Sequence, residues 1–216
     1  RVSYGEKILT IARQEGDAAT VALMAGHLAV AYQDTGNVDG ARRGHEEALG
    51  AFRQLGDEGN VGVALHALGA LAQDRGDLPE AVRLYDASLH TSRRLGDQSS
   101  IASTLHQLGT LAQGRGDFAE ADRFYTETLD IERRLGDQRS IAQTLHNLGV
   151  LAQDRGDLPE ADRLHTESLN IKRRLGDQAG IANTLHQLGN VAYVRGSLPE
   201  AERLYRESLD IKHWLG

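Results

Sequence analysis

The stretch that decides the fold is GDQSSIASTLHQLGTLAQGRGDFAEADRFYTETLDIERRL, residues 96–135, because a near copy of it follows at once. Residues 136–175 differ from it at only 12 of 40 positions. A Gly-Asp pair opens each copy and recurs at the same spacing, as Gly16-Asp17, Gly56-Asp57, Gly96-Asp97, Gly136-Asp137 and Gly176-Asp177. A repeat period of about 20 to 50 residues is typical of solenoids and arrays. We therefore expect a leading helix over 1–15, repeats over 16–55, 56–95, 96–135, 136–175 and 176–215, and one domain over 1–216.

Each repeat is predicted to contain two helices, here called helix A and helix B. In the repeat at 96–135, the apolar side of helix A carries Ile101, Leu105, Leu108 and Ala112, whose spacing places them on one helical face. Helix A then ends at Gly116, because a glycine readily takes the left-handed conformation that closes a helix.

Helix B is predicted to begin at Asp117, which forms a capping box with Glu120. Three helices B also have a proline in their first turn, where the missing N–H costs nothing: Pro79, Pro159 and Pro199. The apolar side of helix B is expected to carry Ala121, Phe124, Tyr125, Leu129 and Leu135. No segment alternates apolar and polar residues as a strand would, so we expect an all-α fold.

The repeats resemble the tetratricopeptide repeat family. The pattern of large, Leu, small, large, Ala, aromatic and small residues is carried by Leu105, Leu108, Gly109, Ala112, Ala121, Tyr125 and Thr128. The other repeats match at equivalent positions, although the repeat at 16–55 has drifted. A leucine replaces the family's tryptophan, and the proline that ends helix B is absent. This 40-residue form is similar to the repeats of the spindle-orientation adaptor Pins/LGN and of bacterial signalling ATPases and regulators, and more distantly to kinesin light chain.

The resemblance implies a right-handed superhelix, an α-solenoid of antiparallel helix pairs, with helices A lining a concave groove. It also implies that peptide contacts lie on the exposed flank of helices A. The expected groove residues are mostly amides and imidazoles, which can donate to and accept from an extended peptide backbone. They are His66, Gln73, His106, Gln107, Thr110, Gln113, His146, Asn147, Gln153, His186, Gln187, Asn190 and Tyr193.

Composition excludes several classes of function. The net charge of −7 repels phosphate backbones, so we expect no nucleic-acid partner. No apolar run approaches the roughly 20 residues of a membrane helix, and the start is not a signal peptide, so we expect no membrane partner and a cytoplasmic protein. The chain lacks cysteine and has no phosphate-binding loop or unique Ser-His-Asp arrangement. We expect neither enzyme activity nor a cofactor.

The histidine column formed by His66, His106, His146 and His186 is open to several interpretations. Each helix A supplies a single histidine, and neighbouring helix axes lie about 8–10 Å apart, which argues against a metal site. A structural role, hydrogen bonding to a peptide and a response to pH remain as alternatives. His45 and His165 occupy the position of Tyr85, Tyr125 and Tyr205, and we expect them to be packing residues with one hydrogen bond each.

Arginine pairs near the end of helix B are expected to complement the helix dipole and to meet the capping aspartate of the next repeat; they are Arg93-Arg94, Arg133-Arg134 and Arg173-Arg174. The alternative is a basic ladder that binds an acidic peptide or a phosphate. Trp214 replaces an arginine of this column and could cap the array, contact a missing repeat or form an adhesive edge.

We therefore expect a protein–protein interaction module that binds a peptide or partner segment in the groove. One alternative is a sensor arm of a larger signalling ATPase or transcription regulator, which binds other domains of its own chain. Another is a scaffold that self-associates through its open repeat ends. Combined alanine replacement of His106, Gln113, His146 and Gln153 is expected to abolish binding and to leave the melting temperature nearly unchanged.

Overall fold

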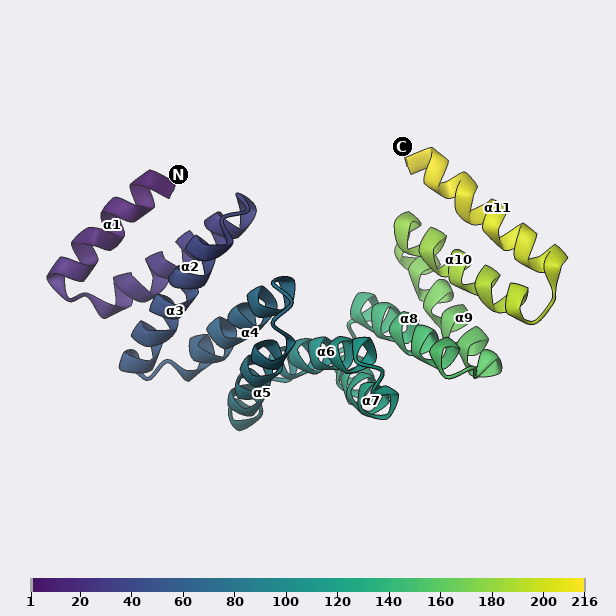
Figure 1. Cartoon of the computed structure of the whole chain (residues 1–216), viewed down its shortest axis with the longest axis horizontal. Coiled ribbons are helices and arrows are strands. Elements are labelled where there is room, and N and C mark those ends of the chain that lie inside the picture. Colours follow the sequence, from purple (N-terminus) through teal and green to yellow (C-terminus); the bar gives the residue numbers. More distant parts are fainter. Residues whose placement is uncertain (1, 216) are drawn as a thin grey trace. The chain divides into compact units, whose positions relative to one another are not determined.

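The computed structural model describes residues 2–215 of the chain, and these residues are almost entirely helical. They hold eleven helices and no strand, which confirms the expected all-α fold (Figure 1). The helices are α1 (Val2–Glu15), α2 (Ala18–Asp34), α3 (Val38–Leu55), α4 (Glu58–Asp74), α5 (Leu78–Leu95), α6 (Gln98–Gly114), α7 (Phe118–Leu135), α8 (Gln138–Asp154), α9 (Leu158–Leu175), α10 (Gln178–Val194) and α11 (Leu198–Leu215).

The chain divides into two compact units, residues 1–104 and 105–216, and the division falls inside α6. In the first unit α2 packs on α3 and α4 packs on α5, while α1 contacts α2 and α3 contacts α4. In the second unit α8 packs on α9 and α10 packs on α11, while α7 contacts α8 and α9 contacts α10. The even-numbered helices are therefore helices A, and each of α2, α4, α8 and α10 contacts the helix B before it and the helix B after it.

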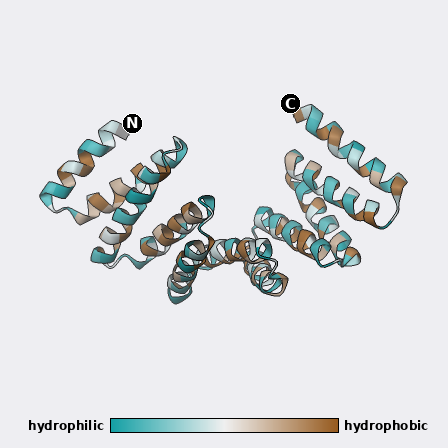
Figure 2. Cartoon of the chain, in the orientation of Figure 1, coloured by the Kyte–Doolittle hydropathy of each residue, from teal (hydrophilic) through white to brown (hydrophobic). Residues whose placement is uncertain are grey.

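The core of each unit consists of the aliphatic faces of helices A and the small and aromatic residues of helices B (Figure 2). The predicted helix A face is confirmed, because Ile101, Leu105, Leu108 and Ala112 are all buried. In the second unit one continuous cluster joins Tyr125 of α7 to residues of α8, α9 and α10. Burial of apolar area between successive helices is the main force that holds such a stack together.

The predicted apolar face of helix B was wrong at one position. Leu135 is 49% exposed, whereas Ile131 and Glu132 of the same helix are buried. The contact face of α7 runs through Tyr125, Thr128 and Glu132, at the helical spacing of three and four residues. Leu135 continues this spacing, three residues after Glu132, but it is the last residue of α7 and half of its side chain is exposed there.

The Gly-Asp pairs end one helix and begin the next, as predicted. Gly136 caps α7 with a left-handed φ of 75°, and the side chain of Asp137 accepts from the N–H of Ser140 in α8. Asp117 caps α7 in the same way, by accepting from the N–H of Glu120. The reciprocal half of the predicted capping box is not formed, because the carboxylate of Glu120 accepts from Arg115 instead.

Replacing Gly136 by valine is expected to lower the free energy of unfolding by about 1–2 kcal/mol, because a side chain in the left-handed conformation is strained. A Cβ atom at this position would meet nothing within 4 Å, so the loss would come from the backbone alone. Asparagine tolerates this conformation better, and Gly136→Asn should lose clearly less stability. Urea unfolding followed by circular dichroism measures both, and equal stability of the valine variant and the wild type would contradict the cap.

Candidate functional site

The residues predicted to contact a peptide all lie on helices A, and we call them the helix A stripe. In the first unit the stripe consists of His66 and Gln73, both on α4. In the second unit it consists of His106, Gln107, Thr110 and Gln113 on α6, His146, Asn147 and Gln153 on α8, and His186, Gln187, Asn190 and Tyr193 on α10. Most of these side chains are half-buried rather than fully exposed.

Three histidines of the stripe link successive helices A. Nδ1 of His66 lies 3.1 Å from Oγ1 of Thr104 in the first unit. In the second unit, Nδ1 of His106 lies 3.4 Å from Oγ1 of Thr144, and Nδ1 of His146 lies 3.5 Å from Oγ1 of the equivalent threonine of α10. These threonines are buried. The histidines therefore have a structural role between repeats.

Burial keeps these histidines neutral at ordinary pH. It lowers the pKa of His66 and of His106 below the usual range for histidine. The pKa of His146 is lowered to about 4, mainly by burial and further by the positive charge of Lys172. His186, on the last helix A, is exposed and packs on the ring of Tyr205 with 5.3 Å between ring centroids.

The amides of the stripe link helix A to helix B of the same repeat. The hydroxyl of Tyr85 donates to Oε1 of Gln73, at 3.1 Å. The same contact recurs between Tyr125 and Gln113 at 3.2 Å, and between His165 and Gln153 at 2.8 Å. Asn190 accepts from the hydroxyl of Tyr205, at 2.8 Å.

His45 and His165 are packing residues with one hydrogen bond each, as predicted. Both are buried, and Nε2 of His45 lies 3.2 Å from Oε1 of Gln33. Nδ1 of His165 has no hydrogen-bond partner. Each therefore takes the place of the tyrosine found in other repeats, with its one hydrogen bond made to helix A.

A polar surface remains accessible beside these internal contacts in the second unit. Gln143 and Asn183 are exposed on α8 and α10, and Tyr193 is 61% exposed. Gln143 donates to Asn147 on its own helix, and the amide of Asn147 donates to Nε2 of His106, at 3.1 Å in both cases. Each of these amides keeps further donors and acceptors that these contacts do not use.

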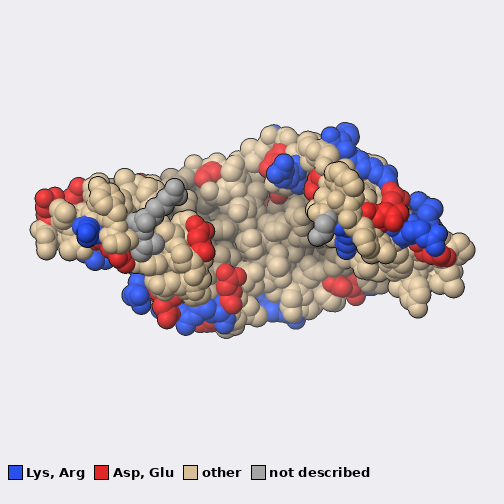
Figure 3. Space-filling model, turned by 90° about the horizontal axis from the view of Figure 1, so that it is seen from above, with Lys and Arg blue, Asp and Glu red and all other residues tan. Residues whose placement is uncertain are grey.

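The stripe itself is uncharged when its histidines are neutral. Figure 3 shows Lys and Arg side chains beside Asp and Glu side chains, with uncharged surface between such groups. Asp154 borders the stripe in the second unit and accepts from Nε2 of Gln113, at 2.9 Å. A ligand segment would therefore meet few charges that lose hydration on binding.

Three of the arginines near the ends of helices B pair differently from the prediction. Arg133 binds Glu167 at 3.1 Å, and Arg173 binds Glu207 at 3.0 Å. The partner of these two arginines is a glutamate of the following helix B, rather than the capping aspartate. Arg94 binds Glu58 of α4, at 2.8 Å. The reason is that each capping aspartate already accepts from the first turn of its own helix, as Asp137 does from Ser140.

Sequence reasoning missed the threonines that contact the histidine column. Thr104, Thr144 and Thr184 recur every 40 residues, two positions before a histidine, and this regular spacing was the available signal. Their contacts also correct one expectation. Alanine replacement of His106, Gln113, His146 and Gln153 would remove internal hydrogen bonds, so the melting temperature should fall. Among residues 2–215, no group of three or more His, Asp or Glu side chains could hold a metal ion.

Comparison with known proteins decides the family. A model of the tetratricopeptide repeat matches residues 20–89, 60–134 and 140–212. The chain belongs to the tetratricopeptide repeat family. Repeats of this family generally mediate protein–protein interaction and are generally non-enzymatic. A comparison with curated protein sequences gives no match.

Solved structures of other tetratricopeptide repeat proteins share the fold. BtubC (BKLC) from P. vanneervenii superposes with a TM-score of 0.88 at 23% identity, over 100% of this chain and 91% of that one. A putative kinesin light chain with nearly identical TPR-like repeats, from Podosopora anserina, gives 0.71 at 20% identity, over 87% and 93%. A signal transduction ATPase with a tetratricopeptide repeat sensor, from Pyrococcus horikoshii, gives 0.80 at 15% identity, over 89% of this chain and 30% of that chain. None of the described helices is both long and apolar enough to cross a bilayer.

Proposed function

We propose that this tetratricopeptide repeat chain binds an extended segment of a partner protein along the helix A stripe. The observation that carries the proposal is the arrangement of the stripe in the second unit, where internal hydrogen bonds hold amide side chains in place while leaving part of each accessible. A surface that is already ordered loses little conformational entropy when a ligand binds. Free amide donors and acceptors suit the backbone of an extended peptide.

Exposed residues next to the stripe would provide the contacts. Gln143 of α8 and Asn183 of α10 occupy equivalent positions of successive helices A, so they can contact two successive stretches of one ligand. Tyr193 adds a large exposed ring, and tyrosine supplies contact area at low entropic cost. The half-buried amides Asn147 and Gln187 would line the same path.

A sensor arm of a larger signalling protein is the second candidate. It is favoured by the similarity to a signal transduction ATPase with a tetratricopeptide repeat sensor, and this chain covers 30% of that protein. In that arrangement the same stripe would bind a segment of the chain's own parent protein. The two candidates share the surface and differ in the origin of the ligand.

The test compares the wild type with two triple-alanine variants in affinity capture from the source cell, followed by mass spectrometry. The stripe variant replaces Gln143, Asn183 and Tyr193, which are exposed, so the fold should be retained. The control variant replaces exposed residues of helices B, namely Asp130, Asn170 and Asp210. We expect the stripe variant to lose a partner that the wild type and the control both keep, with melting temperatures within about 2 °C, since exposed substitutions cost little.

Two outcomes distinguish the candidates. Loss of a separate protein in the stripe variant supports the interaction module, whereas loss of a fragment of the parent chain supports the sensor arm. If all three proteins capture the same set of partners, the stripe is not the binding surface and the proposal is wrong.

A further inference from the structure

Pockets at equivalent positions of the repeats lie between successive helices B, on a different side of helix A from the stripe. One lies between α3, α4 and α5, with a volume of about 620 Å³. Its equivalents, between α1, α2 and α3 and between α7, α8 and α9, measure about 410 and 440 Å³. The floor of each is aliphatic and includes Leu49, Leu65 and Leu68 in the α3–α5 pocket. The three pockets differ chiefly in their charged rims.

At three other helices B, an arginine near the end of the helix is neutralised by a glutamate 34 residues later. Arg13 pairs with Glu47 at 2.5 Å, and the same pairing was described above for Arg133 and Arg173. The equivalent arginine of the α3–α5 pocket is Arg53, and the residue 34 positions later is Ala87. Within residues 2–215, the guanidinium group of Arg53 forms no hydrogen bond and no ion pair.

A second arginine of this pocket also lacks the ion-pair partner that is present in other repeats. Arg155 and Arg195, each at the end of a helix A, lie 3.4 and 3.6 Å from Asp122 and Asp162, which precede them by 33 residues. The equivalent arginine is Arg75, and the residue 33 positions earlier is Arg42. Arg75 therefore has a cation at the position where Arg155 and Arg195 have a carboxylate, and its side chain has no ion-pair partner in the described part of the chain.

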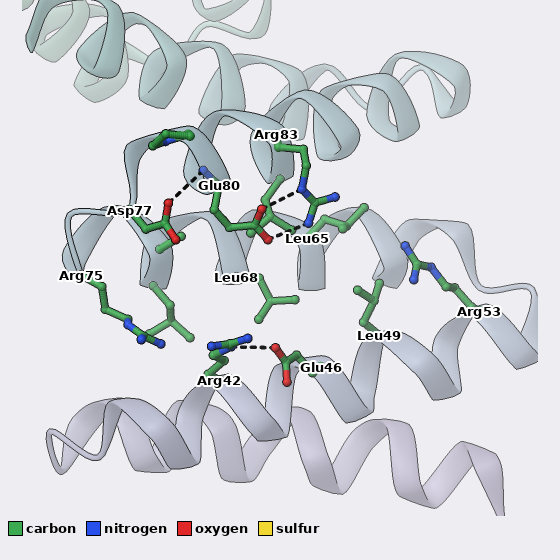
Figure 4. A pocket seen from close by; sticks show the side chains of 14 residues that line it. Arg42, Glu46, Leu49, Arg53, Leu65, Leu68, Arg75, Asp77, Glu80 and Arg83 are labelled. Atoms are coloured by element: carbon green, nitrogen blue, oxygen red, sulfur yellow. Dashed lines mark hydrogen bonds and ion pairs between the residues drawn. The ribbon is translucent and has the colours of Figure 1, made fainter. Parts of the chain in front are cut away.

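The pocket consequently has an excess of positive charge in an acidic protein. Its lining contains four arginines and three carboxylates, whereas the α7–α9 pocket contains three of each and the α1–α3 pocket two of each. Figure 4 shows Arg42 bound to Glu46, and Arg83 bound to Glu80. Arg75 and Arg53 lie at the two ends of the pocket, with Leu68 between them. The two guanidinium groups without partners therefore flank an apolar floor.

We propose that the α3–α5 pocket is a second binding site, which takes an acidic segment of a partner protein with an aliphatic side chain between its carboxylates. Charge complementarity carries this assignment, because each free guanidinium can form a bidentate pair with one carboxylate. The leucine floor would bury the aliphatic side chain between them. A compact phosphate is a poorer fit, because the carboxylates of Glu46 and Glu80 lie inside the pocket and repel a dianion.

The test uses two fluorescein-labelled peptides and fluorescence polarisation. The acidic probe is Gly-Asp-Glu-Leu-Leu-Glu-Asp-Gly, and the neutral probe has Asn and Gln in place of its Asp and Glu. We expect the wild type to bind the acidic probe at least about tenfold more tightly, since hydrogen bonds between charged groups are stronger than those between neutral groups. The difference should shrink in 1 M salt.

The decisive variant restores the partners found in other repeats, by the double substitution Arg42→Asp and Ala87→Glu. These residues occur at the equivalent positions as Asp122 and Glu167, so the variant should fold at least as well as the wild type. We expect it to bind the acidic probe about tenfold more weakly. The matched control, Arg133→Gln with Arg155→Gln in the α7–α9 pocket, should leave binding unchanged.

Several results would overturn the proposal. Equal binding of the two probes, or unchanged binding by the restored variant, would show that the free arginines do not bind the acidic segment. Displacement of the acidic probe by millimolar inorganic phosphate, as effectively as by unlabelled peptide, would indicate a small-anion site instead. Analytical ultracentrifugation tests self-association. If the wild type forms a dimer and the restored variant does not, the pocket is an interface between two copies of this chain.

Discussion

Replacing Gly149 by valine is expected to lower the free energy of unfolding by about 3 kcal/mol, because overpacking a rigid contact forces the backbone apart. Gly149 of α8 faces the imidazole of His165 in α9, and a Cβ atom there would lie 2.6 Å from Cε1 and Nδ1 of that ring. The ring is completely buried, and its Nε2 is bonded to Gln153. It therefore has little room to move aside, and valine adds two further methyl groups.

The measurement is urea unfolding followed by circular dichroism, with Gly50→Ala as the control. Gly50 lies inside α3, is exposed, and would place a Cβ atom near nothing within 4 Å. Alanine there should raise stability by up to about 1 kcal/mol, since glycine is a poor helix former. A Gly149→Val variant as stable as the wild type would show that helices α8 and α9 are not in contact through this glycine.

The same close approach occurs in other repeats, and it explains why the repeat pattern has a small residue at this position of helix A. Cβ atoms at Gly69, Gly109 and Gly189 would lie 2.6–2.9 Å from the ring of a tyrosine in the paired helix B. The glycine and the ring are therefore one unit of packing, repeated with a period of 40 residues. This unit sets how closely helix A and helix B approach each other.

The helices and their ends could be predicted because the signals for them are local. Gly136 and Asp137 occupy cap positions that depend on backbone conformation and on the first turn of the next helix. The apolar face of helix A follows equally directly from the spacing of Leu105 and Leu108. The helices therefore lie where periodicity and capping predicted them.

The chemistry of the stripe could not be read from spacing in the same way. An imidazole and an amide at an exposed helical position look available to a ligand, yet His106 and Gln113 are engaged by Thr144 and Tyr125. Which side chain meets another depends on the distance between helices, and a single repeat does not encode that distance.

Glu132 shows the same limit on helix B. Its equivalent in the next repeat is Lys172, so the position reads as polar and solvent-facing, yet both side chains are buried. Burial raises the pKa of Glu132 to about 7 and lowers the pKa of Lys172. A buried position that accepts both an acid and a base gives no hydrophobic signal in the sequence.

Replacing His165 by tyrosine is expected to make the protein more resistant to acid. The wild-type imidazole is fully buried, and burial lowers its pKa to about 3, with smaller contributions from the nearby charges of His146 and Lys172. In the unfolded chain a histidine has a pKa of about 6.5. The fold therefore requires the neutral ring, and the stability that depends on it is complete above pH 6.5 and is lost as the pH falls towards 3.

Tyrosine at this position removes that titration without removing the packing. Tyr85 and Tyr125 occupy the equivalent positions and bond to Gln73 and Gln113, so the hydroxyl of a tyrosine at 165 can reach Gln153. Tyrosine stays neutral throughout the acid range. The two proteins should therefore have similar stability at pH 7.5. At pH 4.5, two units below the pKa of histidine in the unfolded chain, the variant should be more stable by about 2.7 kcal/mol.

Urea unfolding at several pH values between 7.5 and 4.5 measures this difference. His90→Tyr is the control, because His90 is exposed on α5 and its replacement should leave the pH dependence as it is in the wild type. His146 remains in the His165→Tyr variant, and its pKa of about 4 should cause a residual loss of stability in acid. If the stability of wild type and variant falls in parallel between pH 6.5 and 4.5, protonation of His165 does not drive acid unfolding, and the ring is less enclosed than its burial indicates.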